Sequence, residues 1–308
     1  MLYLHYEIYT LLVGYISVAC HFTEATYKNK YLSIFRLYYN SNEKILAQSN
    51  KVMTEYLKFK ELHNQTLPLI IGNVWNVQSA KIYEKLKFQA IGTSSAAIAH
   101  SLGYEDGEQM PFSGLLFIVE RISKSVPLPL SVDIEFGYGN TATEIANNII
   151  RLEKLGIVGI NIEDSIIENG ERKLKDNLQF SQLLQDVKGI LKQQGISIFI
   201  NVRCDAFLLN IPNTLQVVSE RIKNYEQSGA DGIFLPCLTK ENDIATIVMH
   251  TKSPLNVMCM PELPNFKTLE KLGVKRISMG NFLNGYTYTS LENMTTKILL
   301  EQSFKAMF

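Results

Sequence analysis

From about Pro68 to the end of the chain, short apolar runs alternate with longer amphipathic segments, and this alternation limits the possible folds more than any other feature. Each apolar run has the length of a buried strand, whereas apolar residues in the following segment recur three and four positions apart, as in a helix. We predict eight strands, over Pro68–Val74, Ala90–Ser94, Leu130–Glu135, Gly159–Glu163, Ser197–Arg203, Gly232–Leu235, Leu255–Met258 and Arg276–Met279.

The segments between and after these strands predict helices. Several end at a glycine (Gly156, Gly195, Gly229 and Gly273), which suits the left-handed position after a helix because glycine has no Cβ to clash. The predicted helices include Val77–Lys87, Thr143–Leu155, Phe180–Gln194, Thr214–Ser228, Glu241–His250 and Phe266–Leu272, with a last one at Leu291–Phe304.

The order of these elements predicts an α/β fold with a parallel sheet. The strands are nearly continuous hydrophobic runs, which is typical of parallel strands buried on both faces. Eight strand–helix units in succession favour one closed (β/α)8 barrel, the TIM fold, over an open doubly wound sheet. The dinucleotide-binding alternative has little support, because Gly137-Tyr138-Gly139 is only a fragment of its glycine fingerprint and follows the third strand rather than the first.

The first 52 residues differ from the rest. The most apolar part, Leu11–Cys20, is about half as long as a membrane span, and no positive charge precedes it as in a signal peptide. Met53 then opens an ordinary enzyme-like segment. We therefore predict that residues 1–52 are an extension outside the fold and that residues 53–308 form the barrel. A membrane-tethered version would rest on Leu11–Cys20 alone.

Charge and cysteine content narrow the class of protein further. Thirty basic and thirty acidic residues give a net charge of zero, which argues against a nucleic-acid partner. The four cysteines, Cys20, Cys204, Cys237 and Cys259, have neither CxxC nor zinc-ligand spacing. Reduced thiols in a cytoplasmic enzyme are the expectation.

Unusual polar residues fall at the predicted strand ends, where the functional residues of such barrels lie. Asp133 and Glu135 close the third strand, two positions apart and so expected on one face. Glu163 closes the fourth strand, and Arg203 and Asp205 close the fifth. Any one acid could be an ordinary structural ion-pair partner, but their gathering at successive strand ends favours a site.

Three converging carboxylates suit a hard cation such as Mg²⁺, with Mn²⁺ as an alternative, because these ions take oxygen ligands and Mg²⁺ keeps several waters. Asp133, Glu135 and Glu163 are the predicted metal ligands, directly or through water. Arg203 nearby would pair with a carboxylate or phosphate, for which its planar fork is suited.

Four segments of this sequence resemble the isocitrate lyase/phosphoenolpyruvate mutase superfamily. The resemblance runs from about Thr54 to the C-terminus, and the order and spacing of the segments are specific. The segments are Thr93–Ala96, Ser101–Gly107, Val132–Asn140 and Gly159–Asp164.

The resemblance implies a magnesium-dependent barrel that handles small 2-oxo acids or phosphonates through an enolate. It also implies that the last helix is exchanged between the subunits of a homodimer or homotetramer. By the same resemblance, Asp106 is a further acid near metal and substrate, Ser94 and Ser95 contact the substrate carboxylate, and Arg203 is the anion-binding arginine. Trp75, at the end of the first strand, would cover a small substrate or pack in the core.

The sequence departs from the family where members differ in reaction. The stretch Asp164–Leu174 holds neither the cysteine and histidine of the lyases nor the lysine, asparagine and serine block of the phosphomutases. Lys173 and Lys175 are present but displaced. Cys204, Cys237 or Cys259 could supply a missing acid or base, or could be small apolar fillers.

Two functions therefore remain open. The first is a Mg²⁺-dependent lyase or phosphomutase-like enzyme that cleaves or forms a C–C or P–C bond in a small 2-oxo acid or phosphonate. The second is a catalytically degenerate barrel that binds metal and carboxylates in a regulatory role. The intact acids favour the first, and the altered Asp164–Leu174 stretch motivates the second.

Overall fold

The structure is a computed structural model that describes residues 54–308. These residues lie in one compact unit. The predictions for residues 1–52, including the extension and the apolar stretch Leu11–Cys20, lie outside the described residues.

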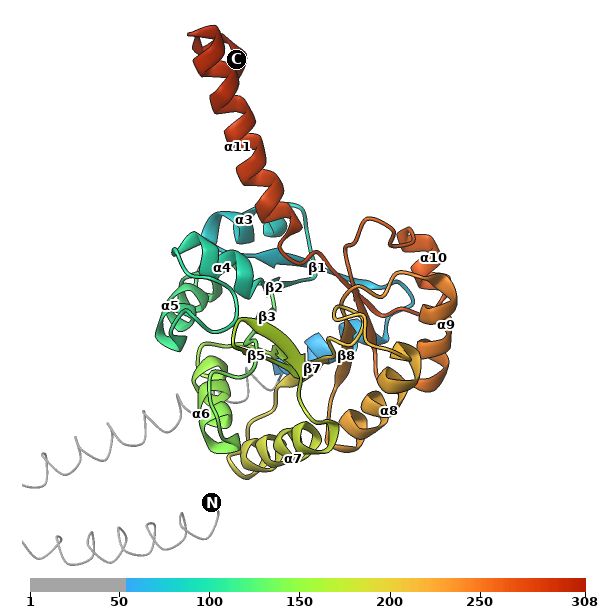
Figure 1. Cartoon of the computed structure of the whole chain (residues 1–308). Helices are drawn as coiled ribbons and strands as arrows, with labels where there is room; N and C mark the ends of the chain where they lie inside the picture. The colour runs from blue at the N-terminus through green and yellow to red at the C-terminus, as the bar shows by residue number, and fades with distance from the viewer. Residues whose placement is uncertain (1–53) are drawn as a thin grey trace, which may run out of the picture. The chain divides into compact units, whose positions relative to one another are not determined.

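Eight parallel strands close into a barrel, which confirms the predicted (β/α)8 fold (Figure 1). Each strand pairs with its neighbours in the order β1-β2-β3-β4-β7-β8-β9-β10, and β10 closes on β1. The strands are β1 (Leu69–Val74), β2 (Ala90–Thr93), β3 (Leu130–Asp133), β4 (Gly159–Glu163), β7 (Phe199–Arg203), β8 (Gly232–Leu235), β9 (Leu255–Met258) and β10 (Arg276–Ser278).

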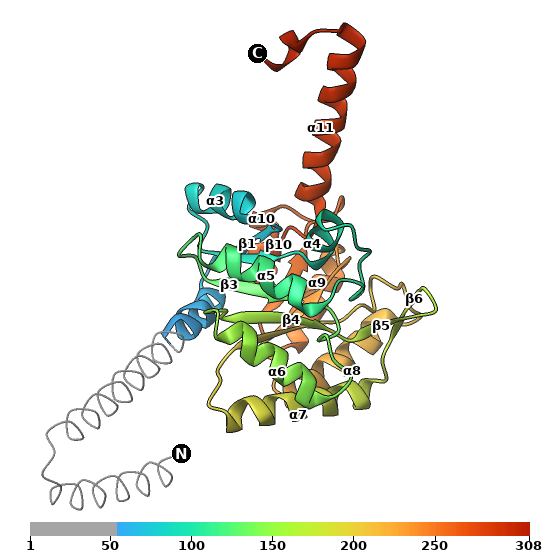
Figure 2. The same cartoon turned by 90° about the vertical axis from the view of Figure 1, so that its left-hand side faces the viewer.

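Helices surround the barrel, as in Figures 1 and 2, and six of them match the predicted segments to within a few residues. These six are α3 (Val77–Lys85), α6 (Ala142–Glu153), α7 (Asn177–Gln193), α8 (Thr214–Gln227), α9 (Glu241–His250) and α10 (Phe266–Lys271). The predicted glycines at the helix ends have positive φ angles, from 70° at Gly195 to 96° at Gly229, so the reason given for their position holds.

Several elements differ from the predicted ones. Two helices follow β2, α4 (Ser95–Ser101) and α5 (Phe112–Ser123), and an antiparallel hairpin follows β4, made of β5 (Ser165–Glu168) and β6 (Glu171–Leu174). The last helix, α11 (Phe282–Glu301), begins earlier than predicted, and a short 3-10 turn (Phe304–Met307) follows it. Figures 1 and 2 show α11 projecting away from the barrel.

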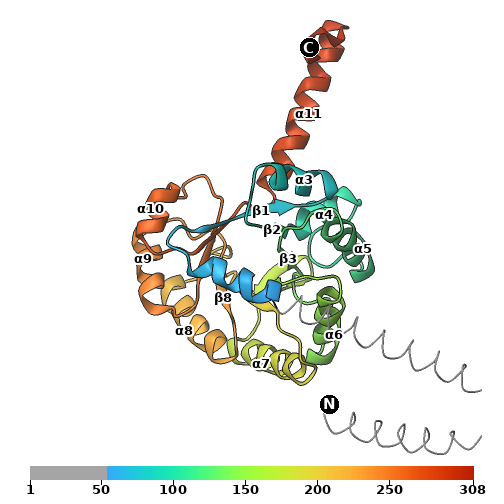
Figure 3. The ribbon, with the colours of Figure 1, turned by 180° about the vertical axis from the view of Figure 1, so that it is seen from behind.

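The amino-terminal end of the barrel is closed by aromatic side chains. Residues 54–61 are helical and lie across this end (Figure 3). Phe59 is fully buried, and the His63 ring stacks on Phe199 with centroids 4.3 Å apart. Above this plug, a layer of buried polar side chains crosses the barrel interior, in which the Asn201 amide donates to Asn161 and Asn256. The interior of the barrel is therefore filled from this end, and a ligand that binds at the barrel axis would have to lie at the opposite, carboxyl end.

Among residues 54–308, no helix combines the length and the hydropathy that a membrane crossing requires.

Candidate active site

The predicted polar residues do meet at the carboxyl ends of neighbouring strands. Asp133 is the last residue of β3, Glu163 the last of β4 and Arg203 the last of β7. Glu163 and Arg203 are partners in the register of β4 and β7, so their side chains leave the sheet side by side. This placement follows from the parallel order of the strands, because all their carboxyl ends face the same rim.

Glu163 and Arg203 form a buried ion pair. An Arg203 Nη1 lies 2.9 Å from Glu163 Oε2, and Arg203 Nε lies 2.6 Å from Asp205 Oδ1. Burial opposes the charge of Arg203, but Glu163, Asp205 and Asp133 more than offset it and raise the pKa of Arg203. Burial raises the pKa of Glu163, and the positive charges of Arg203 and Arg172 oppose that rise. The arginine is thus a permanent, oriented cation at the rim.

Asp106, Asp133 and Glu135 form a second group, whose negative charge is offset only in part by Arg203 and by the 3.5 Å contact between Arg172 Nη2 and Asp106 Oδ2. Burial, and then the charges of Asp106 and Asp133, raise the pKa of Glu135 to about 7. The pKa of Asp133 is also raised by burial, although Arg203 opposes the shift. Asp106 Oδ1 is buried and has no hydrogen-bond partner among the described residues. The pKa values of Asp133 and Glu135 stay raised despite these arginines, so a bound cation would stabilise the charged form of the group.

Glu135 lies in this group for a different reason from the predicted one. Strand β3 ends at Asp133, and Glu135 has a left-handed backbone with φ of 48°. Its carboxylate is oriented by two donors: the Tyr138 hydroxyl, 2.9 Å from Oε1, and the Glu108 backbone N–H, 2.7 Å from Oε2. Glu135 does lie beside Asp133, as predicted, but the predicted strand was too long, and the turn after β3 rather than strand alternation sets the direction of Glu135. A left-handed non-glycine residue at such a position is often found in functional sites.

The donors fit a hydrated cation rather than an ion enclosed by protein ligands. Among residues 54–308, no three acidic, histidine or cysteine side chains are close enough together to bind one metal ion directly. Magnesium usually keeps several waters, so carboxylates that surround it need not all touch it. Such an ion would offset the remaining negative charge of Asp106, Asp133 and Glu135, and a water bound to it could donate to the unpartnered oxygen of Asp106.

Ser94 and Ser95 follow β2 and begin helix α4. The Ser94 hydroxyl caps the helix by accepting from the Ala97 backbone N–H, and its own backbone N–H donates to the Val74 carbonyl. The Ser95 hydroxyl donates to Asp133 Oδ2 at 2.9 Å. The structure therefore joins Ser95 to the acid group, whereas both polar groups of Ser94 are already engaged in the backbone around β2.

Trp75 is not joined to the acids by any described contact. It is half-buried and packs against the hydrophobic core, while its backbone N–H donates to the Ser79 hydroxyl. Core packing, the second of the two predicted roles, is the one the contacts favour.

Arg172, which was not predicted as a site residue, reaches this site from strand β6 of the hairpin. Its Nη1 lies 2.8 Å from the Ser165 hydroxyl and 3.2 Å from Asp205 Oδ2, and also contacts Glu163 Oε1. Its Nη2 lies 3.5 Å from Asp106 Oδ2. Arg172 thus joins the Glu163–Arg203 pair to Asp106.

A sequence signal for this hairpin exists. Asn169 and Gly170, with φ of 54° and 80°, form its two-residue turn between two four-residue strands. An Asn-Gly pair between short strands is a strong hairpin signal, because both residues tolerate the positive φ that the turn requires.

Behind the hairpin, a buried polar network holds its two ends. Asp164 is fully buried and accepts from Arg221 Nη1 at 3.0 Å and from the Tyr225 hydroxyl at 2.7 Å, both on α8. Arg221 Nη2 also donates to the Lys175 carbonyl at 2.8 Å, just after β6. Helix α8 therefore fixes the residues that precede and follow the hairpin.

The other candidate acid–base residues are placed less favourably. Cys204 is fully buried beside Asp164, and burial raises the pKa of its thiol, as does the charge of Asp164. Cys237 is half-buried and Cys259 exposed. Lys173 points to solvent and pairs with Glu171, whereas the Lys175 ammonium lies over the rings of Phe136 and Phe180. Among residues 54–308, no hydrogen bond joins one of these cysteines to Asp106, Asp133 or Glu135.

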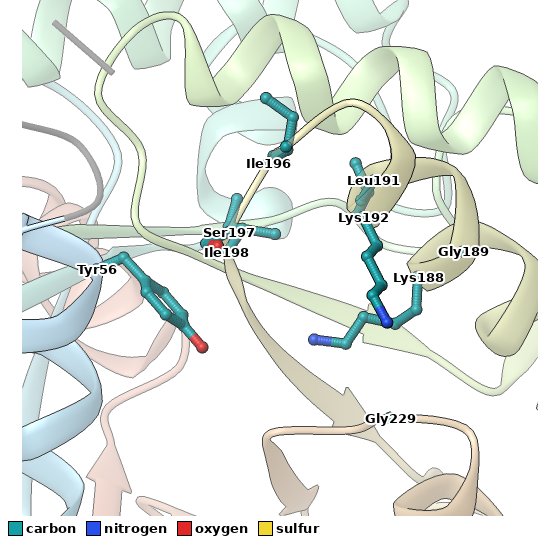
Figure 4. A pocket seen from close by; sticks show the side chains of 10 residues that line it. Tyr56, Lys188, Gly189, Leu191, Lys192, Ile196, Ser197, Ile198 and Gly229 are labelled. Atoms are coloured by element: carbon teal, nitrogen blue, oxygen red, sulfur yellow. The ribbon is translucent and has the colours of Figure 1, made fainter. Parts of the chain in front are cut away.

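A separate cavity of about 500 Å³ lies at the other ends of the strands. Figure 4 shows Tyr56, Lys188 and Lys192 around it, next to Ile198, which directly precedes β7. Lys188 is paired with Asp231 at 2.7 Å. Because it opens at the amino-terminal ends of the strands, this cavity is not part of the carboxylate site.

A closed parallel barrel with carboxylates and arginines at its carboxyl rim defines the class of β/α-barrel enzymes, whose active sites lie at that rim. The chain belongs to the phosphoenolpyruvate phosphomutase family, whose model matches residues 59–299. The predicted resemblance to the isocitrate lyase/phosphoenolpyruvate mutase superfamily is thereby confirmed. Members of this superfamily are lyases and mutases that act on 2-oxo acids and phosphonates.

Similar proteins carry several activities. A 2-methylisocitrate lyase of Shewanella oneidensis is 30% identical over 65% of this chain and 68% of its own length. Oxaloacetate decarboxylase 1 of Pseudomonas fluorescens is 29% identical over 66% of this chain and 71% of its own length.

Solved structures agree with the fold. A phosphonomutase-like protein from Burkholderia cenocepacia J2315 superposes with a TM-score of 0.74 at 31% identity, over 79% of this chain and 99% of its own. A phosphonopyruvate hydrolase determined with oxalate and Mg²⁺ superposes with a TM-score of 0.72 at 19% identity, over 82% of this chain and 89% of its own.

Proposed function

We propose that this protein is a divalent-metal-dependent enzyme that cleaves or forms a C–C or P–C bond in a small 2-oxo acid or phosphonate through an enolate. The observation that carries the proposal is the buried, unpartnered Oδ1 of Asp106 in a group with Asp133 and Glu135, whose negative charge Arg203 and Arg172 offset only in part. Relatives named for 2-methylisocitrate cleavage, oxaloacetate decarboxylation and phosphoenolpyruvate mutation support this choice of chemistry.

The acids would hold the ion, Mg²⁺ or Mn²⁺, with Glu163 beside them through water. When bound, the ion supplies Lewis-acid stabilisation of an oxyanion next to a carbonyl. The chain's own groups orient the acids: Ser95 donates to Asp133, and Tyr138 and the Glu108 backbone N–H donate to Glu135. These contacts fix the carboxylates before a ligand arrives, which is what electrostatic catalysis requires.

Arg203 would bind the negative charge that develops on the substrate. Glu163 and Asp205 hold its guanidinium from two sides, at 2.9 and 2.6 Å, so it need not reorganise during the reaction. A preorganised donor of this kind is worth about 10²–10³ in rate in other enzymes. Asp106 Oδ1, which has no partner among the described residues, would accept a hydrogen bond from the substrate or from a water bound to the ion.

Turnover of a substrate panel tests this function. Oxaloacetate, phosphonopyruvate, phosphoenolpyruvate, 2-methylisocitrate and 2,3-dimethylmalate would each be incubated with Mg²⁺, and the products identified by NMR. We expect one substrate to give a product that Glu163→Gln abolishes and that Glu168→Gln, the same change at an exposed hairpin position, leaves unchanged. Turnover that survives in Glu163→Gln would contradict the assignment of the site.

The second candidate is a barrel that binds a metal ion and carboxylates without turnover. The observation in its favour is the hairpin, which offers an arginine where the lyases of this family offer a cysteine and a histidine. An absence of turnover across the panel, together with Mg²⁺-dependent binding of oxalate as an enolate mimic, would favour this candidate.

We also propose that α11 docks on another subunit, in a homodimer or homotetramer. Almost all of its residues are exposed, and it carries many large apolar side chains that cover nothing in this chain. These are Phe282, Leu283, Tyr286, Tyr288, Leu291, Met294, Leu299 and Leu300. Light scattering would show a dimer or tetramer of the whole chain, and a monomeric protein at micromolar concentration would contradict the proposal.

A further inference from the structure

The β5–β6 hairpin directs one arginine at the rim of the barrel. In its register Ile167 is opposite Arg172, so both side chains lie on the same face. Ile167 packs on Gly107, where a Cβ would have no room, and Arg172 reaches the preceding residue, Asp106. The hairpin face that carries Arg172 is therefore seated on the loop next to the site.

The two ends of the Arg172 guanidinium have different surroundings. Nη1 is held by three acceptors, on Ser165, Asp205 and Glu163. Among residues 54–308, Nη2 contacts only Asp106 Oδ2, at 3.5 Å, and the Asp106 side chain is 38% exposed. One end of the fork is thus anchored in the protein, and the other makes a long contact that a stronger acceptor can replace.

Arg172 and Arg203 share one carboxylate. Arg203 contacts Glu163 Oε2, and Arg172 contacts Glu163 Oε1, so two guanidiniums lie on either side of the same group. Arginine keeps its proton at neutral pH, which means that Arg172 cannot act as the acid or base that a cysteine would be. Its geometry suits a carboxylate or phosphonate, with charge-assisted hydrogen bonds.

We propose that Arg172 is a specificity-determining residue that binds a second anionic group of the substrate, beyond the bond that is broken. That anion takes the place of Asp106 on Nη2 and leaves Asp106 to the cation. The site therefore selects 2-oxo acids that carry a further carboxylate or phosphonate over those with one anionic group. This inference rests on the proposed function, since it assumes that the enolate part of the substrate lies at Arg203.

Binding of two non-reacting probes in the presence of Mg²⁺ tests the role of Arg172. Oxalate occupies the place of the enolate alone, whereas 3,3-difluorooxaloacetate adds a distal carboxylate. Calorimetry would compare the wild type, Arg172→Gln, Arg172→Lys and, as a control on the same strand, Lys173→Gln, whose exposed side chain pairs only with Glu171. Phosphonopyruvate, followed with the same variants, would distinguish a distal phosphonate from a distal carboxylate.

We expect Arg172→Gln to weaken binding of difluorooxaloacetate about 10- to 100-fold, the usual weight of charge-assisted hydrogen bonds, and to change oxalate affinity less than about threefold. Arg172→Lys should retain part of the affinity, and Lys173→Gln should change neither probe. Equal weakening of both probes, or of neither, would show that Arg172 only fastens the hairpin and would overturn the proposal.

The same titrations separate this inference from the proposed function. If the wild type binds oxalate with Mg²⁺ but binds 3,3-difluorooxaloacetate no more tightly, the role of Arg172 is contradicted and the proposed function is not. A wild type that binds neither probe with Mg²⁺ contradicts both. Thermal unfolding of each variant would show whether its fold is intact.

Discussion

Replacement of Glu135 by glutamine should stabilise the metal-free protein at neutral pH. Glu135 is 3% exposed, and its pKa is raised from 4.5 in the unfolded chain to about 7, first by burial and then by Asp106 and Asp133. At pH values between 4.5 and about 7, the folded state therefore binds more protons than the unfolded state. By linkage, stability due to Glu135 is present at low pH and falls as the pH rises from 4.5 to 7.

The size of the effect follows from the shift. A rise of the Glu135 pKa from 4.5 to about 7 corresponds to about 3 kcal/mol of stability, which is fully lost above about pH 8. Glu135→Gln keeps the shape of the side chain, and the Tyr138 hydroxyl can accept from its amide. We therefore expect the variant to match the wild type near pH 4 and to exceed it by up to about 3 kcal/mol at pH 8.

Urea unfolding in EDTA at several pH values from 4 to 8 would measure this difference. Saturating Mg²⁺ should restore the wild type and leave the variant nearly unchanged, because only the wild type binds the ion fully. A variant that is less stable at every pH would refute the reasoning. So would a difference that does not change with pH, since the carboxylate would then serve only as an acceptor for Tyr138 and Glu108.

Three further predictions concern other parts of the molecule. Burial, and then the charge of Arg276, lower the pKa of His63 to about 3, so below pH 6.5 the unfolded chain binds a proton that the folded protein does not. The free energy of unfolding of the wild type should therefore fall by about 2 kcal/mol between pH 7.5 and pH 5, whereas that of His63→Gln should not show this loss, as urea unfolding at the two pH values would measure. Arg221→Met should destabilise by about 3–5 kcal/mol because it leaves buried Asp164 without its cation, and Asp164→Asn in the same chain should recover part of the loss in the same assay. Among the three cysteines of residues 54–308, peptide mapping after iodoacetamide should find Cys259 labelled before the others and Cys204 only on unfolding, and early labelling of Cys204 would contradict its burial.

The barrel and its rim could be predicted because they depend on pattern. Buried parallel strands leave continuous apolar runs, and the residue that ends each run points to the rim, as Asp133, Glu163 and Arg203 do. No helix bounds were predicted between the second and third strands, where the chain forms α4 and α5. Helix α4 has only seven residues, which is too short for an amphipathic period to stand out. The family resemblance supplied Ser95 and Asp106, which spacing alone did not select.

Side-chain directions after the strands could not be predicted in the same way. Glu135 was placed on a continued strand, but a left-handed residue turns the chain there. Arg172 lies nine residues after Glu163 in sequence and reaches it only because the Asn169-Gly170 turn folds the chain back. Contacts of this kind depend on a turn, so they appear in the sequence only when the turn itself is recognised.

Titration of oxalate in the presence and absence of Mg²⁺ tests the central claim, a cation held beside Arg203 by Asp106, Asp133 and Glu135. The account predicts that Mg²⁺ strengthens oxalate binding by about tenfold or more over EDTA, and that Asp133→Asn removes this gain. Oxalate affinity that is the same with Mg²⁺ and with EDTA would contradict it.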